Sequence, residues 1–354
     1  MKISRTTGCA LLLLGALSLP AAGDTRVGSI ESTTAFQLLE IERSVRTVQP
    51  DAPVLLRAVL TDATEAAQST HRDPKSIGEA LEVLNAIQES LERHNFLQPE
   101  DKKDWPLSLG NAFVPLQLSK DQLAVHLAQT FNARRRARFD LTKPFYFVDC
   151  DMGAELFLAV GQRLGWDIRL VEVPDHNFVR WHFSKTVSIN WDWTQGRSVP
   201  DSDYVRPTEL FASLVSRGIY LRSFTPVEAR AYYLGLIGAV ATKTSDKIEL
   251  LEKAIAGFPM QAANQNNLAW TIATDKELAS KKAALAVSNS LASLSVDPDD
   301  GARVDTLACA FSIRGEWALA LALEDYAASH AASEGDHEGF LQNKKRIEAK
   351  ELCQ

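Results

Sequence analysis

Apolar residues recur with two different periods along this chain of 354 residues, and the changes of period divide it into three parts. From about residue 31 to residue 96 the spacing is three or four, most clearly between Ile77 and Leu91. After Gly165 the spacing drops to two, and from about Val227 a spacing of three or four returns and continues to the end. A period of 3.6 indicates helices and a period of two indicates strands. The pattern therefore predicts an α+β protein with a helical N-terminal region at 24–104, an α+β domain at 105–226 and an all-helical region at 227–354.

The central part, 105–226, has the pattern of one helix followed by consecutive short strands. Apolar residues recur at every fourth position from Met152 to Leu164 and predict a helix at 151–164, and Gly165 then provides a helix stop. A short entry strand is expected before this helix, at 145–148. Three more strands are expected at 168–173, 178–183 and 187–193, with Pro174-Asp175 as the first turn. Consecutive short strands predict an antiparallel sheet with the helix packed on it.

The C-terminal part contains an internal repeat. Three Leu-small pairs recur, and their small residues lie 34 and 39 positions apart: Leu234-Gly235, Leu268-Ala269 and Leu307-Ala308. This spacing resembles the tetratricopeptide repeat, a helix pair of about 34 residues. A plain helical bundle is the alternative, because the second spacing is longer. If the resemblance holds, the pairs stack on one another and on the central domain, and they bind a peptide or protein partner.

The first 23 residues have the layout of a secretory signal peptide. Lys2 and Arg5 precede an apolar run at 10–19, and small residues follow at 20–23. The apolar run is shorter than the roughly 20 residues that a membrane span requires. We therefore expect a cleaved signal and an exported protein, periplasmic or secreted, with an uncleaved anchor as the alternative. No later segment has the length and apolarity of a membrane span.

The charge of the chain argues against general binding of nucleic acids. The formal net charge is −7, and it becomes −9 when Lys2 and Arg5 leave with the signal peptide. An acidic protein repels a phosphate backbone. One basic cluster, Arg134-Arg135-Arg136 with Arg138, is predicted to be a solvated loop or helix edge.

Cys150 has the sequence context of a reactive thiol. It lies at the predicted start of the central helix, between Asp149 and Asp151. The free N–H groups and partial positive charge of a helix N-terminus favour a thiolate and can stabilise an oxyanion. The two aspartates oppose this by raising the pKa of the thiol, unless one of them caps the helix.

A nucleophilic cysteine needs a base and a residue that orients the base. His176 is the best-placed base, because it opens a strand after the Pro174-Asp175 turn, close in sequence to the helix, and His182 shares its strand face. Asn190 and Asp192 share a face of the next strand, so either could orient the imidazole. No metal site is expected, because Cys150 and His176 lack a second close pair of ligands.

Three segments together resemble the transglutaminase-like superfamily, and in particular its bacterial branch. The cysteine helix is matched by Asp149-Cys150-Asp151 and the residues up to Gly165, the histidine strand by 173–181, and the aspartate strand by 189–196. The resemblance implies a papain-like arrangement with Cys150 as nucleophile, His176 as base and Asp192 as orienting residue, and it implies no cofactor. Phe147-Val148-Asp149 replaces the usual glycine-rich lead.

The resemblance implies thiol-dependent acyl transfer or amide hydrolysis on a peptide or protein substrate. Hydrolysis is favoured, because nothing in the sequence marks a second amine site. Asn111 and Tyr146 are the candidates for completing an oxyanion hole. The alternative function is that of a non-catalytic scaffold or binding protein that keeps the triad fold.

Two cysteines lie in the C-terminal helices. Cys309 and Cys353 could form a disulfide, or Cys353, which is close to the end of the chain, could be free. An odd cysteine count after signal cleavage leaves at least one thiol outside any internal pair.

Overall fold

The computed structural model describes residues 27–99, 105–296 and 298–354, so the predicted signal peptide lies outside the described residues. The N-terminal region is helical, as predicted, and consists of α1 (Thr34–Val45), α2 (Ala52–Thr70) and α3 (Ile77–Arg93). α3 begins where Ser76 accepts a hydrogen bond from Glu79 N–H, which is an ordinary N-cap. In the described part of the chain, no helix has both the length and the apolarity needed to cross a membrane.

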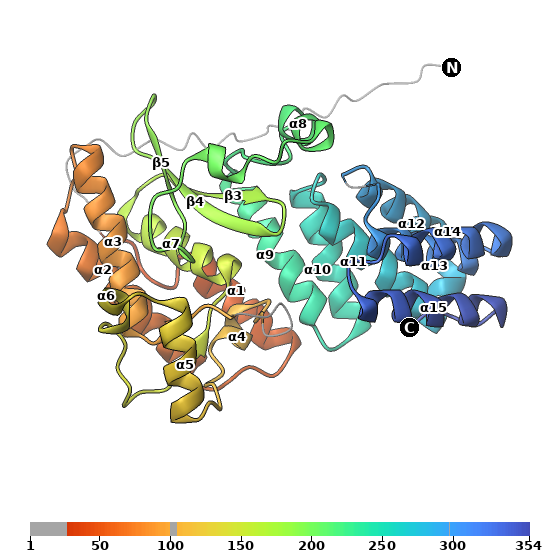
Figure 1. Ribbon diagram of the computed structural model, residues 1–354, viewed down its shortest axis with the longest axis horizontal. Coiled ribbons are helices and arrows are strands. Elements are labelled where there is room, and N and C mark those ends of the chain that lie inside the picture. The colour runs from red at the N-terminus through yellow and green to blue at the C-terminus, as the bar shows by residue number, and fades with distance from the viewer. Residues whose placement is uncertain (1–26, 100–104, 297) are drawn as a thin grey trace, which may run out of the picture.

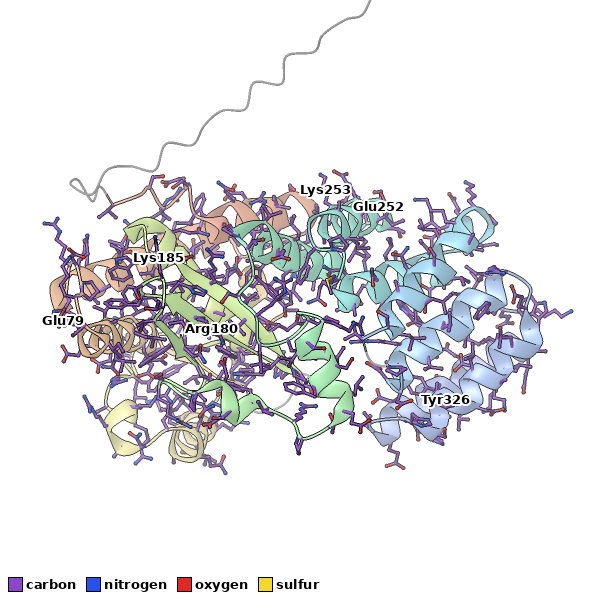
Figure 2. The ribbon with its side chains drawn as sticks, turned by 90° about the horizontal axis from the view of Figure 1, so that it is seen from above. Glu79, Arg180, Lys185, Glu252, Lys253 and Tyr326 are labelled. Atoms are coloured by element: carbon purple, nitrogen blue, oxygen red, sulfur yellow. A yellow bond between two sulfur atoms is a disulfide. The ribbon has the colours of Figure 1, made fainter. Side chains whose placement is uncertain are left out.

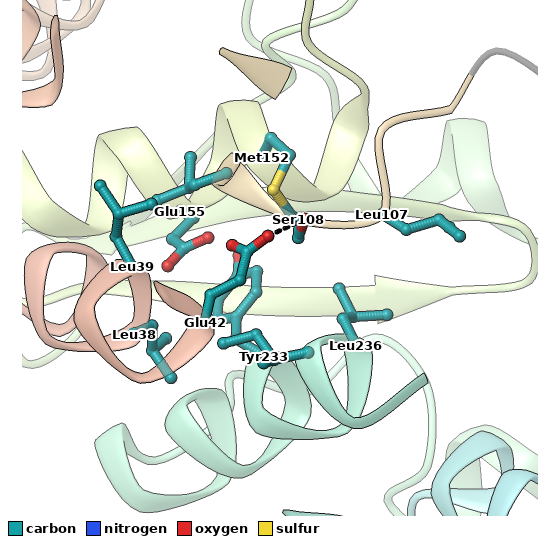
Figure 3. A pocket seen from close by; sticks show the side chains of 11 residues that line it. Leu38, Leu39, Glu42, Leu107, Ser108, Met152, Glu155, Tyr233 and Leu236 are labelled. Carbon is teal, nitrogen blue, oxygen red and sulfur yellow. Dashed lines mark hydrogen bonds between the residues drawn. The ribbon is translucent and has the colours of Figure 1, made fainter. Parts of the chain in front are cut away.

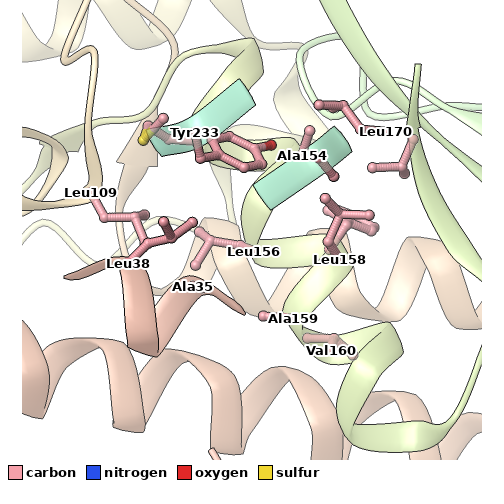
Figure 4. Packing of buried hydrophobic residues seen from close by; sticks show 14 of the residues in the cluster. Ala35, Leu38, Leu109, Ala154, Leu156, Leu158, Ala159, Val160, Leu170 and Tyr233 are labelled. Atoms are coloured by element: carbon pink, nitrogen blue, oxygen red, sulfur yellow. The ribbon is translucent and has the colours of Figure 1, made fainter. Parts of the chain in front are cut away.

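The central sheet has three antiparallel strands in the order β3-β4-β5. They are β3 (Ile168–Val173), β4 (His176–His182) and β5 (Ser188–Trp191). The long helix α7 (Cys150–Leu164) packs against β3 and β4 (Figure 1). In Figure 4, Leu156 of α7 lies toward Leu38 of α1, while Leu158 lies toward Leu170 of β3. The helix thus joins the N-terminal helices and the sheet in one core, and the α+β class is confirmed.

The predicted entry strand has a partner that the sequence pattern did not indicate. β2 (Tyr146–Phe147) pairs in parallel with β1 (Phe96–Leu97), the strand that follows α3 along the chain. It does not pair with the three-stranded sheet. Asn95, with a left-handed φ of 60°, fixes this junction. Its side chain accepts a hydrogen bond from Asp140 N–H at 2.8 Å and donates to Asp140 O at 2.7 Å. Short helices lie between β1 and β2 along the chain, namely α4 (Leu109–Ala112), α5 (Lys120–Thr130) and α6 (Ala133–Arg136).

Arg134 and Arg136 are exposed in α6, as predicted, but Arg135 and Arg138 are not simply solvated, and for these two the sequence prediction was wrong. Arg135 and Arg138 lie 2.7 and 2.6 Å from the carboxylate of Glu92, a residue of α3 with 0% exposure. A buried carboxylate requires paired charges. The sequence did not reveal that Glu92 points inward, so the structural role of the two arginines was missed.

After the 3-10 helix η2 (Asp201–Tyr204) and the short helix α8 (Glu209–Ser216), the chain consists of consecutive helices, each packed on the next (Figure 1). They are α9 (Pro226–Val240), α10 (Thr244–Gly257), α11 (Ala262–Thr274), α12 (Lys276–Leu294), α13 (Gly301–Ile313), α14 (Trp317–Ser329) and α15 (Glu334–Glu348). Tyr233 and Ile237 of α9 belong to the same core as α1 and α7. The first helix pair is therefore continuous with the α+β part of the chain.

A disulfide joins Cys309 of α13 to Cys353. The sequence left this pairing open. Cys353 follows the last helix, so the bond attaches the C-terminal tail to α13. Cys150 is the one free cysteine among the described residues.

The small residues of the predicted repeat lie where helices meet closely. Ala269 and Ala308 are fully buried, and a Cβ atom on Gly235 would overlap the side chain of Asn264 on α11. We expect Gly235→Ala to lower the free energy of unfolding by about 1–3 kcal/mol, because α9 and α11 would have to separate or Asn264 would have to move. Urea denaturation measures the change. Gly339→Ala in α15, where a Cβ meets nothing within 4 Å, is the matched control and should not destabilise. Equal losses in the two variants would contradict this packing.

Candidate active site

The first residue of α7 is Cys150, as the sequence predicted to within one position. Asp149 is the N-cap, and its Oδ1 accepts a hydrogen bond from Met152 N–H at 2.9 Å. Asp149 therefore caps the helix. Because its carboxylate is engaged with a backbone N–H, its negative charge opposes a thiolate at Cys150 less strongly than a free carboxylate would. The Cys150 side chain is buried, with 7% exposure.

His176 and Asp192 are in contact. His176 opens β4 opposite Val173, and Asp192 follows β5 directly. His176 Nε2 lies 2.9 Å from Asp192 Oδ2. Asp192 is fully buried, and other donors hold its carboxylate, namely Thr194 Oγ1 at 2.7 Å, Gln195 Nε2 at 2.9 Å and Tyr204 Oη at 2.8 Å. The carboxylate is thus fixed in position before it meets the imidazole.

These contacts keep Asp192 ionised. Burial alone would raise the pKa of Asp192, but hydrogen bonds from His176, Thr194 and Tyr204 hold this pKa well below its ordinary value. A charged Asp192 favours the imidazole tautomer that carries its proton on Nε2, because that proton faces the carboxylate. Nδ1 is then the basic nitrogen of His176.

The two alternative residues are engaged elsewhere. Asn190 accepts a hydrogen bond from Arg180 Nε at 2.7 Å and donates to Asp201 at 2.7 Å; Arg180 is labelled on the sheet in Figure 2. His182 Nε2 lies 2.8 Å from Ser223 Oγ. Of the candidates for base and orienting residue, His176 and Asp192 are therefore the pair that the structure brings together.

Asn177, the residue after His176, contacts the first turn of α7. The backbone N–H of Asn177 lies near the Cys150 sulfur and acts to lower the pKa of its thiol. The Asn177 side chain is buried and donates to Tyr232 Oη at 2.8 Å and to Asp151. Within the described ranges, no hydrogen bond joins Cys150 to His176. Asn177 thus fixes the start of β4 against the start of α7.

The resting thiol of Cys150 is protonated at neutral pH. Burial raises the pKa of Cys150 well above its ordinary value, and the charges of Asp151 and Asp149 raise it further. A base must therefore remove the proton when the sulfur attacks. The site suits general-base activation better than a preformed thiolate.

An open depression of about 400 Å³ adjoins His176 and Asp192. Thr194, Gln195 and Tyr204 form part of its wall. The Tyr204 ring stacks on the imidazole, with centroids 5.7 Å apart. Sequence reasoning missed Tyr204, because it lies in the 3-10 helix η2, outside any strand or helix pattern. The depression could hold a peptide segment beside the imidazole.

The oxyanion-hole candidates have other surroundings in the described structure. Tyr146 packs edge-on against Phe96, with centroids 5.8 Å apart, and burial and then Asp51 raise its pKa. Asn111 lies in α4, where its N–H is capped by Ser108. Neither residue makes a hydrogen bond to Cys150 in the described parts of the chain. The backbone N–H groups at the start of α7 remain the best oxyanion donors.

In the described part of the chain, one group of side chains is close enough together to hold a metal ion, and this group does not lie at the candidate active site. It consists of Cys309, Glu324 and Cys353, and both of its cysteines belong to the disulfide. Cys150 and His176 belong to no such group among the described residues.

Asp149→Asn is expected to speed the alkylation of Cys150 at pH 9. Burial, and then the charge of Asp151, raise the pKa of Asp149 to about 8, so Asp149 is ionised at pH 9 and raises the pKa of the thiol. Asparagine caps a helix equally well and carries no charge. We expect the rate of iodoacetamide reaction to increase roughly threefold to tenfold at pH 9 and to change little at pH 7. Asp167→Asn, which alters an exposed carboxylate on the rim of another cavity, is the control. A slower reaction at pH 9 would contradict this assignment.

No family model matches this chain, and no curated protein and no solved structure matches it significantly.

Proposed function

We propose that this protein is an exported transglutaminase-like protein that uses Cys150 for acyl transfer or amide hydrolysis on a peptide or protein substrate. The observation that carries the proposal is the contact of His176 with a buried, ionised Asp192, together with a cysteine at the N-terminus of α7, the helix that packs against β4. Buried aspartate–histidine pairs beside a thiol or hydroxyl serve as bases in nucleophilic catalysis.

In the proposed reaction, His176 Nδ1 takes the proton of the Cys150 thiol while the sulfur attacks the amide carbonyl carbon. The oxyanion accepts hydrogen bonds from N–H groups at the start of α7. The amine then leaves with the proton held by His176, and a thioester to Cys150 remains. Water, deprotonated by His176, attacks the thioester and releases the acid and the thiol; an amine in place of water would complete an acyl transfer. Asp192 stays ionised throughout and stabilises the imidazolium.

We also propose that the helices after Val227 form a tetratricopeptide-like region that binds a peptide or protein. Packing of buried small residues between the helices of this region supports this reading. Because α9 shares the core of α7, a partner held by the helices would be fixed relative to Cys150.

A second function, non-catalytic binding, is favoured by one observation. The Cys150 thiol is buried, and two buried aspartates oppose its ionisation. A protein that only binds its partner would keep the fold without needing an accessible thiol.

Reaction with p-nitrophenyl acetate separates the two functions. The catalytic proposal predicts a stoichiometric burst of nitrophenolate and an acetyl group on Cys150, found by mass spectrometry of the digested protein. His176→Ala should slow the burst roughly 10²-fold to 10⁴-fold, because the general base is lost. Cys150→Ser serves as the control for acetylation of other residues. A burst that is absent, or that is independent of His176, would favour the binding protein.

A further inference from the structure

A second cavity, of about 140 Å³, lies at the junction of α7, β3 and α9, with Thr34 of α1 at its edge. Most of its walls are apolar or aromatic: Leu158, Trp166, Ile168, Phe224, Ala229 and Tyr233. A cavity of about 150 Å³ with apolar walls can hold one benzene-sized molecule. This cavity therefore has room for a small organic ligand rather than for a single water.

Three charged residues line this cavity, and one of them, Glu155 of α7, is buried, whereas Asp167 and Arg169 lie at the rim. Glu155 is 3% exposed, and its Oε1 has no hydrogen-bond partner among the described residues. Glu155 also lines a smaller cavity, which it shares with Glu42 and Ser108 (Figure 3). Glu155 is thus the polar wall between the two spaces.

The other buried glutamate in Figure 3 is differently placed. Glu42 accepts hydrogen bonds from Ser108 Oγ at 2.7 Å and Gly110 N–H at 2.9 Å, and it lies 3.5 Å from Arg46. The chain therefore satisfies Glu42 internally and leaves an oxygen of Glu155 unsatisfied. Buried polar groups without a partner are rare and costly, so each needs a reason.

The surroundings of Glu155 select for a positively charged partner. Burial, and then the acidic groups Glu42, Asp151 and Asp149, raise the pKa of Glu155 well above its ordinary value. A cation at this carboxyl would donate the missing hydrogen bond and would favour the ionised carboxylate, so Glu155 would release its proton as the cation binds. A second anion would instead raise the pKa of Glu155 further.

We propose that this cavity binds a small molecule with one apolar ring or short branched chain and one protonated amine, whose ammonium group donates to Glu155. The apolar body packs against Trp166, Phe224 and Tyr233. The rim is polar: Thr34 N–H donates to Gln162 at 2.7 Å, and Asp167 pairs with Arg169. Since α7 begins with Cys150 and α9 begins the C-terminal helices, such a ligand would bridge these two parts of the core.

Benzylamine is a suitable probe, with benzyl alcohol as its neutral counterpart of the same shape. Isothermal titration of the full chain at pH 7.5 should show benzylamine binding at least roughly tenfold more tightly than benzyl alcohol. Glu155→Gln should abolish this preference, because an amide carries no charge. Glu42→Gln is the matched control: it alters the other buried glutamate, which lines the small cavity only, and it should retain the preference.

Equal affinities for the two compounds, binding of neither, or an unchanged preference in Glu155→Gln would each overturn the proposal. Ala229→Leu provides a second variant that keeps Glu155 and fills the cavity from the α9 side. It should weaken benzylamine binding at least roughly tenfold. Full retention of binding in Ala229→Leu would place the ligand elsewhere and would also overturn the proposal.

Discussion

Asp192→Asn is expected to slow the acylation of Cys150 roughly 10²-fold to 10⁴-fold, the largest effect predicted for a single substitution that keeps the shape of the site. An asparagine amide can donate to His176 Nε2, which would move the imidazole proton to Nδ1 and leave no base facing the thiol. The hydrogen bonds from Thr194, which are made to Oδ1, would still hold the side chain in place. The nitrophenolate burst rate measures the loss.

Asn190→Ala is the matched control for this prediction. Asn190 lies two residues away along the same segment but bonds to Arg180 and Asp201. Its removal should leave the burst rate within a few-fold of wild type. If Asn190→Ala were the more damaging change, Asn190 and not Asp192 would be the residue that orients His176.

Cys353→Ser should lower the free energy of unfolding by about 4 kcal/mol, the loss expected on the chain-entropy model when a disulfide between residues 44 apart is removed. Both sulfurs are buried, so the substitution also places a hydroxyl in an apolar site. Urea denaturation measures the change, and a reductant supplies the control: it should destabilise wild type by a similar amount and leave Cys353→Ser unchanged. A variant as stable as the oxidised wild type would show that the bond contributes nothing to stability.

The part of the fold with strict periodicity could be predicted closely from the sequence. The expected helix at 151–164 begins one residue earlier in the structure, and the strand expected at 168–173 is β3 itself. The apolar residues of both elements recur at a regular spacing, so periodicity is informative. β1 and β2 each have two residues and pair across a long separation, so they leave no periodic signal.

The candidate site was predictable where it depends on order along the chain, and it was missed where it depends on long-range contacts. His176 opens β4 and Asp192 directly follows β5, so the order of the predicted strands placed them on adjacent segments. Tyr204 reaches Asp192 from η2, and no local pattern marks it. Glu155 did carry a signal, as a charged residue within the apolar run of α7, and sequence reasoning passed over it.

The pH dependence of Cys150 alkylation, compared between wild type and His176→Ala, tests the triad most directly. Iodoacetamide reacts with thiolate, and Cys150 is the one free cysteine in the described structure, so labelled peptides report its ionisation. If His176 acts as the base for Cys150, wild type should react at pH 7 roughly 10²-fold faster than His176→Ala. Equal rates in the two proteins, rising only above pH 9, would show an inert buried thiol and would contradict the triad.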